Sequence, residues 1–212
     1  MKIVLARWAA LLAAICPAAS MGELPEYAPS EVERGQQIYV ICGACHGSLA
    51  QGEQRLGAPS LVGQQDAYLL RQLRNFRTGL RGGKGDDQAR QMRLILDTVS
   101  NESDWKAVIA YLVSLPIQHP QPSLRGDIKA GRQIYTSCSA CHGSSAEGNE
   151  ALDAPSLRSL PDWYIVDELQ KYRTGARGAS PDDAPGIRMR AVAATLRSDE
   201  DIRAVASFIV SR

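Results

Sequence analysis

The sequence predicts an all-α protein built from two similar domains in tandem. The main observation is an internal repeat, because three segments of the first half recur 96 residues further along the chain. The matched segments are 35–39 with 131–135, 58–61 with 154–157, and 77–82 with 173–178. Each half also ends in apolar residues spaced as on one face of a helix, and no alternating strand pattern stands out. Such a repeat predicts two copies of one structural unit.

The repeat also predicts the domain boundaries. We expect an N-terminal domain at 22–115, a linker at 116–122 and a C-terminal domain at 123–212. Three of the seven linker residues are proline, which favours an extended and semi-rigid spacer.

Residues 1–20 are typical of a secretory signal peptide. Basic residues precede a short apolar run, and small residues near position 20 offer a cleavage site. The apolar run is too short to span a membrane, and no other stretch reaches that length. A lipoprotein signal with Cys16 as the acylated residue is the alternative, although Ile15 is a poor fit to the small residue usual before it. Both interpretations predict that the chain leaves the cytoplasm, and we expect it in the periplasm.

The first half contains two signals for helix ends. Ser30 and Glu33 form a capping box, which predicts the start of a helix that runs into the first cysteine motif. Asp66 can cap a second helix at about 67–78, and Gly79 is a suitable end for it.

The last helix of each half carries an apolar stripe with helical spacing. The stripes are Trp105, Val108, Ile109, Leu112 and Val113 in the first half, and Ile202, Val205, Ala206, Ile209 and Val210 in the second. Ser198, with Asp201 three residues later, is the expected cap of the second of these helices. We interpret both stripes as core faces.

A Cys-x-x-Cys-His motif occurs at 42–46 and again at 138–142. This motif is typical of covalent attachment of a c-type haem. The two thiols add to the vinyl groups of the porphyrin, and the adjacent histidine binds the iron. The predicted residues are Cys42, Cys45 and His46 for one haem c, and Cys138, Cys141 and His142 for the other.

Surface disulfides and a zinc site are the alternatives for these motifs. Zinc ribbons pair their Cys-x-x-Cys motifs at short separations, whereas 96 residues separate these two. Disulfides would leave both histidines unexplained. The fifth cysteine, Cys16, lies in the signal segment, so no thiol remains for a haem ligand elsewhere.

These residues resemble those of a known family. Each half resembles a class I cytochrome c, with a glycine and an aromatic residue in the first helix, the Cys-x-x-Cys-His motif, a proline loop, a distal methionine and a closing helix. The tandem arrangement resembles the di-haem periplasmic cytochromes of the c-four type, whose Tyr…Gln-Leu…Phe-Arg-x-Gly signature is similar to 68–79. The resemblance covers 30–212 and implies two class I domains, each wrapped around one covalent haem.

The resemblance also implies roles for individual residues. Pro59 and Pro155 match the proline whose carbonyl accepts the second N–H of the haem-binding histidine; a simple turn proline is the alternative. The first and last helices are expected to cross at a glycine and an aromatic residue, although these could be ordinary helix residues. The crossing pairs would be Gly35 with Tyr111, and Gly131 with Phe208.

Met92 and Met189 are the methionines in the body of the chain. Each lies where class I cytochromes carry the second axial ligand, and we expect each in a loop before the closing helix. Methionine is also a common core filler, and neither residue has the adjacent proline found in many relatives. Two further pairs, Arg77 with Arg81 and Arg173 with Arg177, suit the haem propionates or a solvated loop equally.

The function implied is that of a periplasmic electron carrier rather than an enzyme. Two low-spin haems with His and Met ligands would pass single electrons from a quinol-oxidising complex to a terminal oxidase or reductase. The first alternative is the electron-accepting subunit of a dehydrogenase, for example one in which a flavoprotein oxidises sulfide. The second is a di-haem enzyme, such as a peroxidase or a thiosulfate-oxidising cytochrome, which needs an open iron position or an unusual ligand.

Charge and hydropathy limit the partners. The formal net charge is +1, so the sequence carries no signal for nucleic-acid binding. We expect no transmembrane span, which leaves peripheral association with a membrane open.

Overall fold

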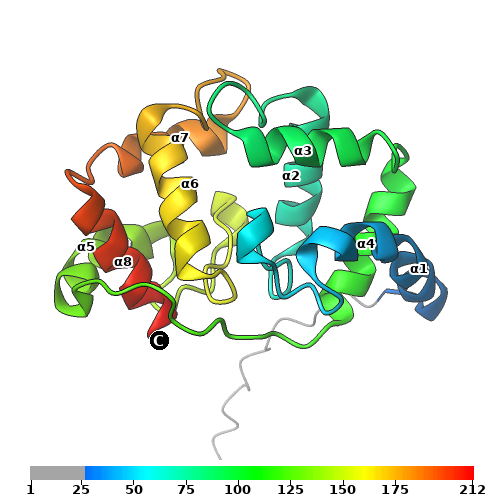
Figure 1. Cartoon of the computed structure of the whole chain (residues 1–212), viewed down its shortest axis with the longest axis horizontal. Coiled ribbons are helices and arrows are strands. Elements are labelled where there is room, and N and C mark those ends of the chain that lie inside the picture. Colours follow the sequence, from blue (N-terminus) through cyan, green and yellow to red (C-terminus); the bar gives the residue numbers. More distant parts are fainter. Residues whose placement is uncertain (1–26) are drawn as a thin grey trace, which may run out of the picture.

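The computed structural model of the chain describes residues 27–212, so the expected signal segment at 1–20 lies outside the described residues. Within this part the protein is helical and has no β-strand (Figure 1). The first half contains α1 (Pro29–His46), η1 (Gln54–Leu56), α2 (Asp66–Thr78), α3 (Asp87–Leu96) and α4 (Glu102–Ser114). The second half repeats this order with α5 (Ile128–His142), η2 (Glu150–Leu152), α6 (Asp162–Thr174), α7 (Ala184–Ala193) and α8 (Asp199–Val210). The predicted all-α fold is confirmed.

The first and last helices of the N-terminal half pack against each other at Gly35. A Cβ atom on Gly35 would overlap the carbonyl oxygen of Ala107 and lie 2.9 Å from Cβ of Tyr111. Because glycine has no side chain, the backbone of α1 can pack directly against the backbone of α4. The ring of Tyr39, one turn further along α1, lies 5.3 Å from the ring of Tyr111. The expected pairing of Gly35 with Tyr111 is confirmed.

The C-terminal half repeats this packing between α5 and α8. A Cβ on Gly131 would overlap the carbonyl oxygen of Ala204 and lie 2.8 Å from Cβ of Phe208. The ring of Tyr135 lies 5.4 Å from that of Phe208. Ser198 caps α8 as expected, because its hydroxyl accepts a hydrogen bond of 3.2 Å from the backbone N–H of Asp201.

The start of α1 differs from the prediction. The helix begins at Pro29 with Ala28 as its N-cap, and the carboxylate of Glu31 accepts from the Ala28 N–H at 3.3 Å. The predicted capping box of Ser30 and Glu33 is therefore wrong. The reason is Pro29, whose fixed φ and missing N–H suit the first helical position and start the helix earlier.

The second helix agrees with the prediction within one residue. Asp66 is the first residue of α2 rather than its cap, and the position before it is the N-cap. The helix ends at Gly79, whose φ of 78° is the left-handed conformation that glycine adopts without strain.

Both methionine segments are helical, so the prediction that Met92 and Met189 lie in loops is wrong. Met92 lies within α3 and Met189 within α7. The α3 segment consists mostly of good helix formers. The α7 segment begins with a proline in its first turn, and Asp183 caps it by accepting from the Gly186 N–H at 3.0 Å.

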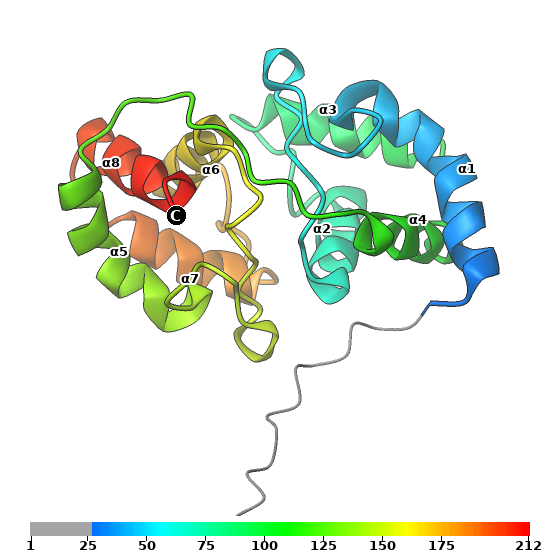
Figure 2. The ribbon, with the colours of Figure 1, turned by 90° about the horizontal axis from the view of Figure 1, so that it is seen from below.

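The connection between α4 and α5 runs from one half to the other along one side of the molecule (green in Figure 2). The end of this connection nearer to α5 is held by Asp162. Asp162 is the first residue of α6, and its side chain is fully buried. The Asp162 carboxylate accepts from the backbone N–H groups of Ser123 and Leu124 at 2.7 and 2.8 Å, and from the Ser123 hydroxyl at 2.5 Å.

We predict that Asp162→Ala lowers the free energy of unfolding by about 2–3 kcal/mol, because it leaves two backbone N–H groups without partners. Chemical denaturation of the holoprotein measures this change. Asp66→Ala is the matched control, since Asp66 occupies the same position in the repeat but is only half-buried and accepts from a tyrosine hydroxyl, that of Tyr27. Equal losses in the two variants would contradict the prediction.

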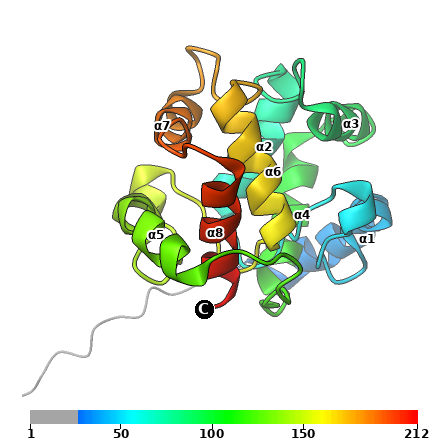
Figure 3. The same cartoon turned by 60° about the vertical axis from the view of Figure 1, so that its left-hand side comes forward.

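Helices α2 and α6 lie at the centre of the molecule and face each other across the boundary between the halves (Figures 1 and 3). The Gln64 side chain donates to the Ser156 carbonyl at 2.6 Å, and the Ser159 hydroxyl donates to the Val62 carbonyl. Arg71 forms an ion pair with Asp153. Because each contact joins residues of different halves, the two haem motifs are held in one arrangement.

Candidate haem-binding sites

Each cysteine motif forms the end of a helix. Cys42 and Cys45 lie one turn apart on α1, and His46 is its last residue; the second motif ends α5 in the same way. Residues three apart on a helix share a face, so the two thiols point to one side. A glycine with positive φ, 81° at Gly47 and 82° at Gly143, then turns the chain away.

The four motif cysteines are free thiols within the described part of the chain. No group of three or more His, Cys, Asp or Glu residues in that part could hold a metal ion. The second cysteine of each motif is exposed, and the first is partly buried against the core.

Both motif histidines are buried and oriented by a proline carbonyl. Nδ1 of His46 donates to the Pro59 carbonyl at 2.8 Å, and Nδ1 of His142 donates to the Pro155 carbonyl at 2.9 Å. Burial lowers the pKa of both imidazoles, and the carbonyl hydrogen bond opposes this more weakly. Each ring is therefore neutral near pH 7, with its proton on Nδ1 and the lone pair of Nε2 free to bind a metal.

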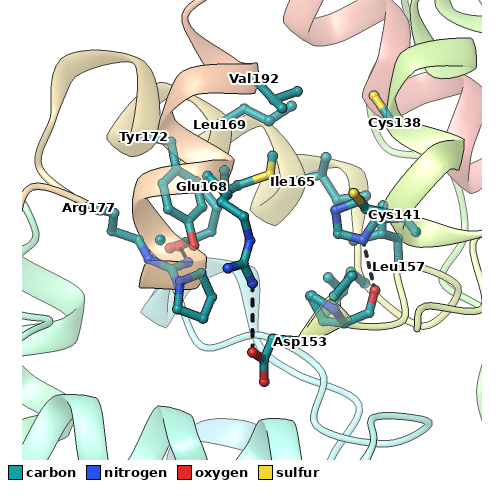
Figure 4. Close-up of a pocket in the computed structure, with 18 of the residues that line it drawn as sticks. Cys138, Cys141, Asp153, Leu157, Ile165, Glu168, Leu169, Tyr172, Arg177 and Val192 are labelled. Carbon is teal, nitrogen blue, oxygen red and sulfur yellow. Dashed lines mark hydrogen bonds and ion pairs between the residues drawn. The ribbon is translucent and has the colours of Figure 1, made fainter. Parts of the chain in front are cut away.

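A deep pocket brings the C-terminal site residues together (Figure 4). It encloses about 1320 Å³ of empty space, part of which is open to solvent. Cys138, Cys141, His142, Pro155 and Met189 all line it, with apolar side chains from α6 and α8. Such a mainly apolar cavity with few polar groups is typical of a cofactor site.

Two of the N-terminal site residues, Cys42 and Met92, are related through two adjacent core clusters. Cys42 packs against the core cluster that contains Tyr39, and Met92 packs against the neighbouring cluster that contains Trp105. Three apolar residues contact both clusters, and these are Ile38, Leu70 and Leu73. Met92 and Cys42 therefore border one continuous apolar region.

In each arginine pair, the first and the second arginine have different surroundings. Arg77 donates to the Leu96 carbonyl at 3.1 Å and pairs with Asp97, and Arg173 pairs with Asp199. Arg81 and Arg177 are instead about 95 % buried, and the Nε atom of each has no hydrogen-bond partner in the described structure.

Arg81 and Arg177 belong to a buried group at the domain boundary, which we call the interface cluster. Its members are Gln72, Arg81, Asp86, Glu168, Lys171 and Arg177. The Glu168 carboxylate lies 3.3 Å from Nη2 of Arg81 and 3.1 Å from Nζ of Lys171, and it pairs with Arg177. Lys171 also reaches the Asp86 carboxylate of the other half at 2.8 Å.

The interface cluster holds Glu168 ionised. Burial alone would raise the pKa of its carboxyl, but Arg177, Arg81 and Lys171 outweigh burial and lower the pKa to about 2. No motif in the sequence marks Glu168, Lys171 or Gln72 as a site residue. The repeat carries one signal, because Glu168 and Lys171 are charged where the equivalent residues at the spacing of 96, Gln72 and Asn75, are neutral.

The cytochrome c family model matches residues 32–116 and again 128–212. The chain therefore belongs to the cytochrome c family and contains two domains of that family in tandem.

Several relatives match the chain over most of their own length. The chain is 30 % identical over 197 residues to a cytochrome c4 from Azotobacter vinelandii, covering 86 % of this chain and 90 % of the relative. It is 27 % identical to a thiosulfate dehydrogenase electron acceptor from Stutzerimonas stutzeri, covering 92 % and 94 %. The reduced crystal structure of cytochrome c4 from Pseudomonas stutzeri superposes with a TM-score of 0.68 at 30 % identity, covering 84 % and 96 %. Among cytochromes c, the chain is of the tandem di-haem c4 type.

The protein is accordingly a di-haem electron-transfer cytochrome, and each domain binds one covalent haem c. The described residues fit this cofactor. The C-terminal pocket joins two thiols, a neutral imidazole and a thioether on apolar walls, and the unpartnered Nε of Arg177 suits a propionate. When bound, the haem supplies the redox chemistry, and the protein supplies orientation, burial and ligands.

Proposed function

We propose that the axial ligands of the two haem irons are His46 with Met92 and His142 with Met189. The thioethers to the porphyrins would form at Cys42 and Cys45, and at Cys138 and Cys141. The observation that carries this proposal is the shared lining of the C-terminal pocket by both cysteines, His142 and Met189. A methionine ligand stabilises ferrous iron and raises the potential, which suits an electron carrier. Pro59 and Pro155 would fix the histidine rings and tune the iron.

We further propose that the chain works in the periplasm as a carrier of single electrons. The signal expected at 1–20 supports export, and no helix within 27–212 is long and apolar enough to cross a membrane. The partners would be a quinol-oxidising complex and a terminal oxidase or reductase. The domain bounds we propose remain 22–115 and 123–212, with 116–122 as linker.

A second candidate function is that of the electron-accepting subunit of a dehydrogenase. The relative named as a thiosulfate dehydrogenase electron acceptor favours it, since that likeness extends over 92 % of this chain. Purification of the tagged protein from its source cells separates the two functions. A stoichiometric dehydrogenase chain that stays bound through gel filtration would support the subunit, and the cytochrome alone would support the carrier.

The ligand proposal predicts the response to carbon monoxide. The purified ferrous protein is expected to bind no carbon monoxide, because both irons have two protein ligands, and the ferric form is expected to have the weak far-red band of methionine ligation. Met189→Ala should bind one carbon monoxide per chain and lose about half of that band. Met92→Ala is the matched variant for the other haem. Stoichiometric binding by the wild-type protein would contradict the proposal and favour a di-haem enzyme.

A further inference from the structure

The interface cluster is built on the internal repeat but is not symmetric. Arg81 and Arg177 occupy equivalent positions, and each contacts both Gln72 and Glu168. The Gln72 carbonyl oxygen accepts from Arg81 at 3.0 Å and from Arg177 at 3.2 Å. The residue equivalent to Gln72 is Glu168, so one half contributes a neutral amide where the other contributes a carboxylate.

Buried charged residues whose equivalents in the other half are neutral are few. The motif histidines and their proline carbonyls match, with hydrogen bonds of 2.8 and 2.9 Å. Among the buried charged residues of the described chain, Glu168 and Lys171 have neutral equivalents, which are Gln72 and Asn75.

The charges of Glu168 and Lys171 face different places. Glu168 and Arg177 line the C-terminal haem pocket (Figure 4), and Gln72 is also part of the lining. Lys171 is not part of it and reaches Asp86 of the N-terminal half at 2.8 Å. The negative end of this pair is therefore at the C-terminal haem site, and the positive end is held by another carboxylate.

We propose that Glu168 is a positioning residue that makes the two haem sites electrostatically unequal and lowers the reduction potential of the C-terminal haem. A fixed anion beside a haem favours the ferric state, which carries one more positive charge. Glu168 also pairs with Nη1 of Arg177, and so partly neutralises the positive charge that this guanidinium, through its unpartnered Nε, would present to a propionate. Both effects lower the potential. Burial makes them stronger, because the surroundings screen the charge little.

The test is a spectroelectrochemical titration of the holoprotein, with haem-methyl proton resonances assigned to each domain through contacts with α1 or α5. Glu168→Gln is expected to raise the potential of the C-terminal haem, and to raise it more than that of the N-terminal haem. Asp167→Asn is the matched control. Asp167 also pairs with Lys171, at 2.7 Å, but it is 38 % exposed and does not line the pocket. Its replacement should shift either potential by less than a quarter as much.

Glu168→Gln could separate the domains, and small-angle scattering would then show an increased radius of gyration. A second variant tests the proposal in that case. Gln72→Glu adds a carboxylate between the same two arginines and should shift the potentials in the opposite direction, downward. Unchanged potentials in Glu168→Gln with docked domains, equal shifts at both haems, or no fall in Gln72→Glu would overturn the proposal.

The inference rests on the proposed function only in placing a haem in the C-terminal pocket, and the two can fail separately. Failure of the ligand proposal is seen in the wild-type protein as carbon monoxide binding. The Glu168 proposal fails if the wild-type protein binds no carbon monoxide but the Glu168→Gln and Gln72→Glu variants have the same reduction potentials as the wild type.

Discussion

Replacing Cys138 and Cys141 together by alanine is expected to leave one covalent haem per chain instead of two. The two thiols lie one helical turn apart at the end of α5 and line one pocket with His142. Without them no thioether can form in that domain, whereas the N-terminal motif, on the separate helix α1, is unaffected. The measurements are haem absorbance per chain in denaturing conditions and the intact mass.

The double replacement of Cys42 and Cys45 is the reciprocal variant and should have the same haem content. Peptide mapping should then find haem on the opposite motif in each case. Ser139→Ala is the control and should keep both haems, because Ser139 lies within the second motif but does not line the pocket. Two covalent haems in the variant lacking Cys138 and Cys141 would show that other residues attach the second group.

Gly131→Ala is expected to destabilise the C-terminal domain by about 3 kcal/mol, the upper end of the usual range for inserting a methyl group into a packed core. The new Cβ would overlap the carbonyl oxygen of Ala204 and lie 2.8 Å from Cβ of Phe208. These atoms belong to the backbone and to the base of a side chain, so α5 and α8 must separate. Denaturant titration of the holoprotein, followed by far-ultraviolet circular dichroism, measures the loss.

The sign of this change is informative because helix propensity predicts the opposite. In a helix with free space around it, replacing glycine by alanine stabilises by about 1 kcal/mol. Gly83→Ala, in the connection between α2 and α3, is the control for adding a methyl group where there is room, since nothing lies within 4 Å of a Cβ at that position. A stabilised Gly131→Ala variant would contradict the close approach of α5 and α8.

Local patterns were read correctly from the sequence where the physical cause is also local. The end of α2 at Gly79 needs only a residue that accepts a positive φ, and the Ser198 cap needs only a hydroxyl three residues before a free N–H. The predicted start of α1 is wrong because Ser30 and Glu33 match a capping pattern two residues after the observed pair of Ala28 and Glu31, which Pro29 favours. The resemblance predicts loops at Met92 and Met189, whereas the local residues allow the helices that the structure has there.

The sequence by itself determined where haem is expected to attach, since the two thiols and the histidine of each motif lie within five consecutive residues. The tertiary structure decided which charges meet. Glu168 and Arg81 are 87 residues apart in the chain, and Lys171 and Asp86 lie on opposite sides of the linker. No periodicity or motif relates such residues. These residues are buried where the two halves meet, and burial strengthens the proposed effect of their charges because water screens them little.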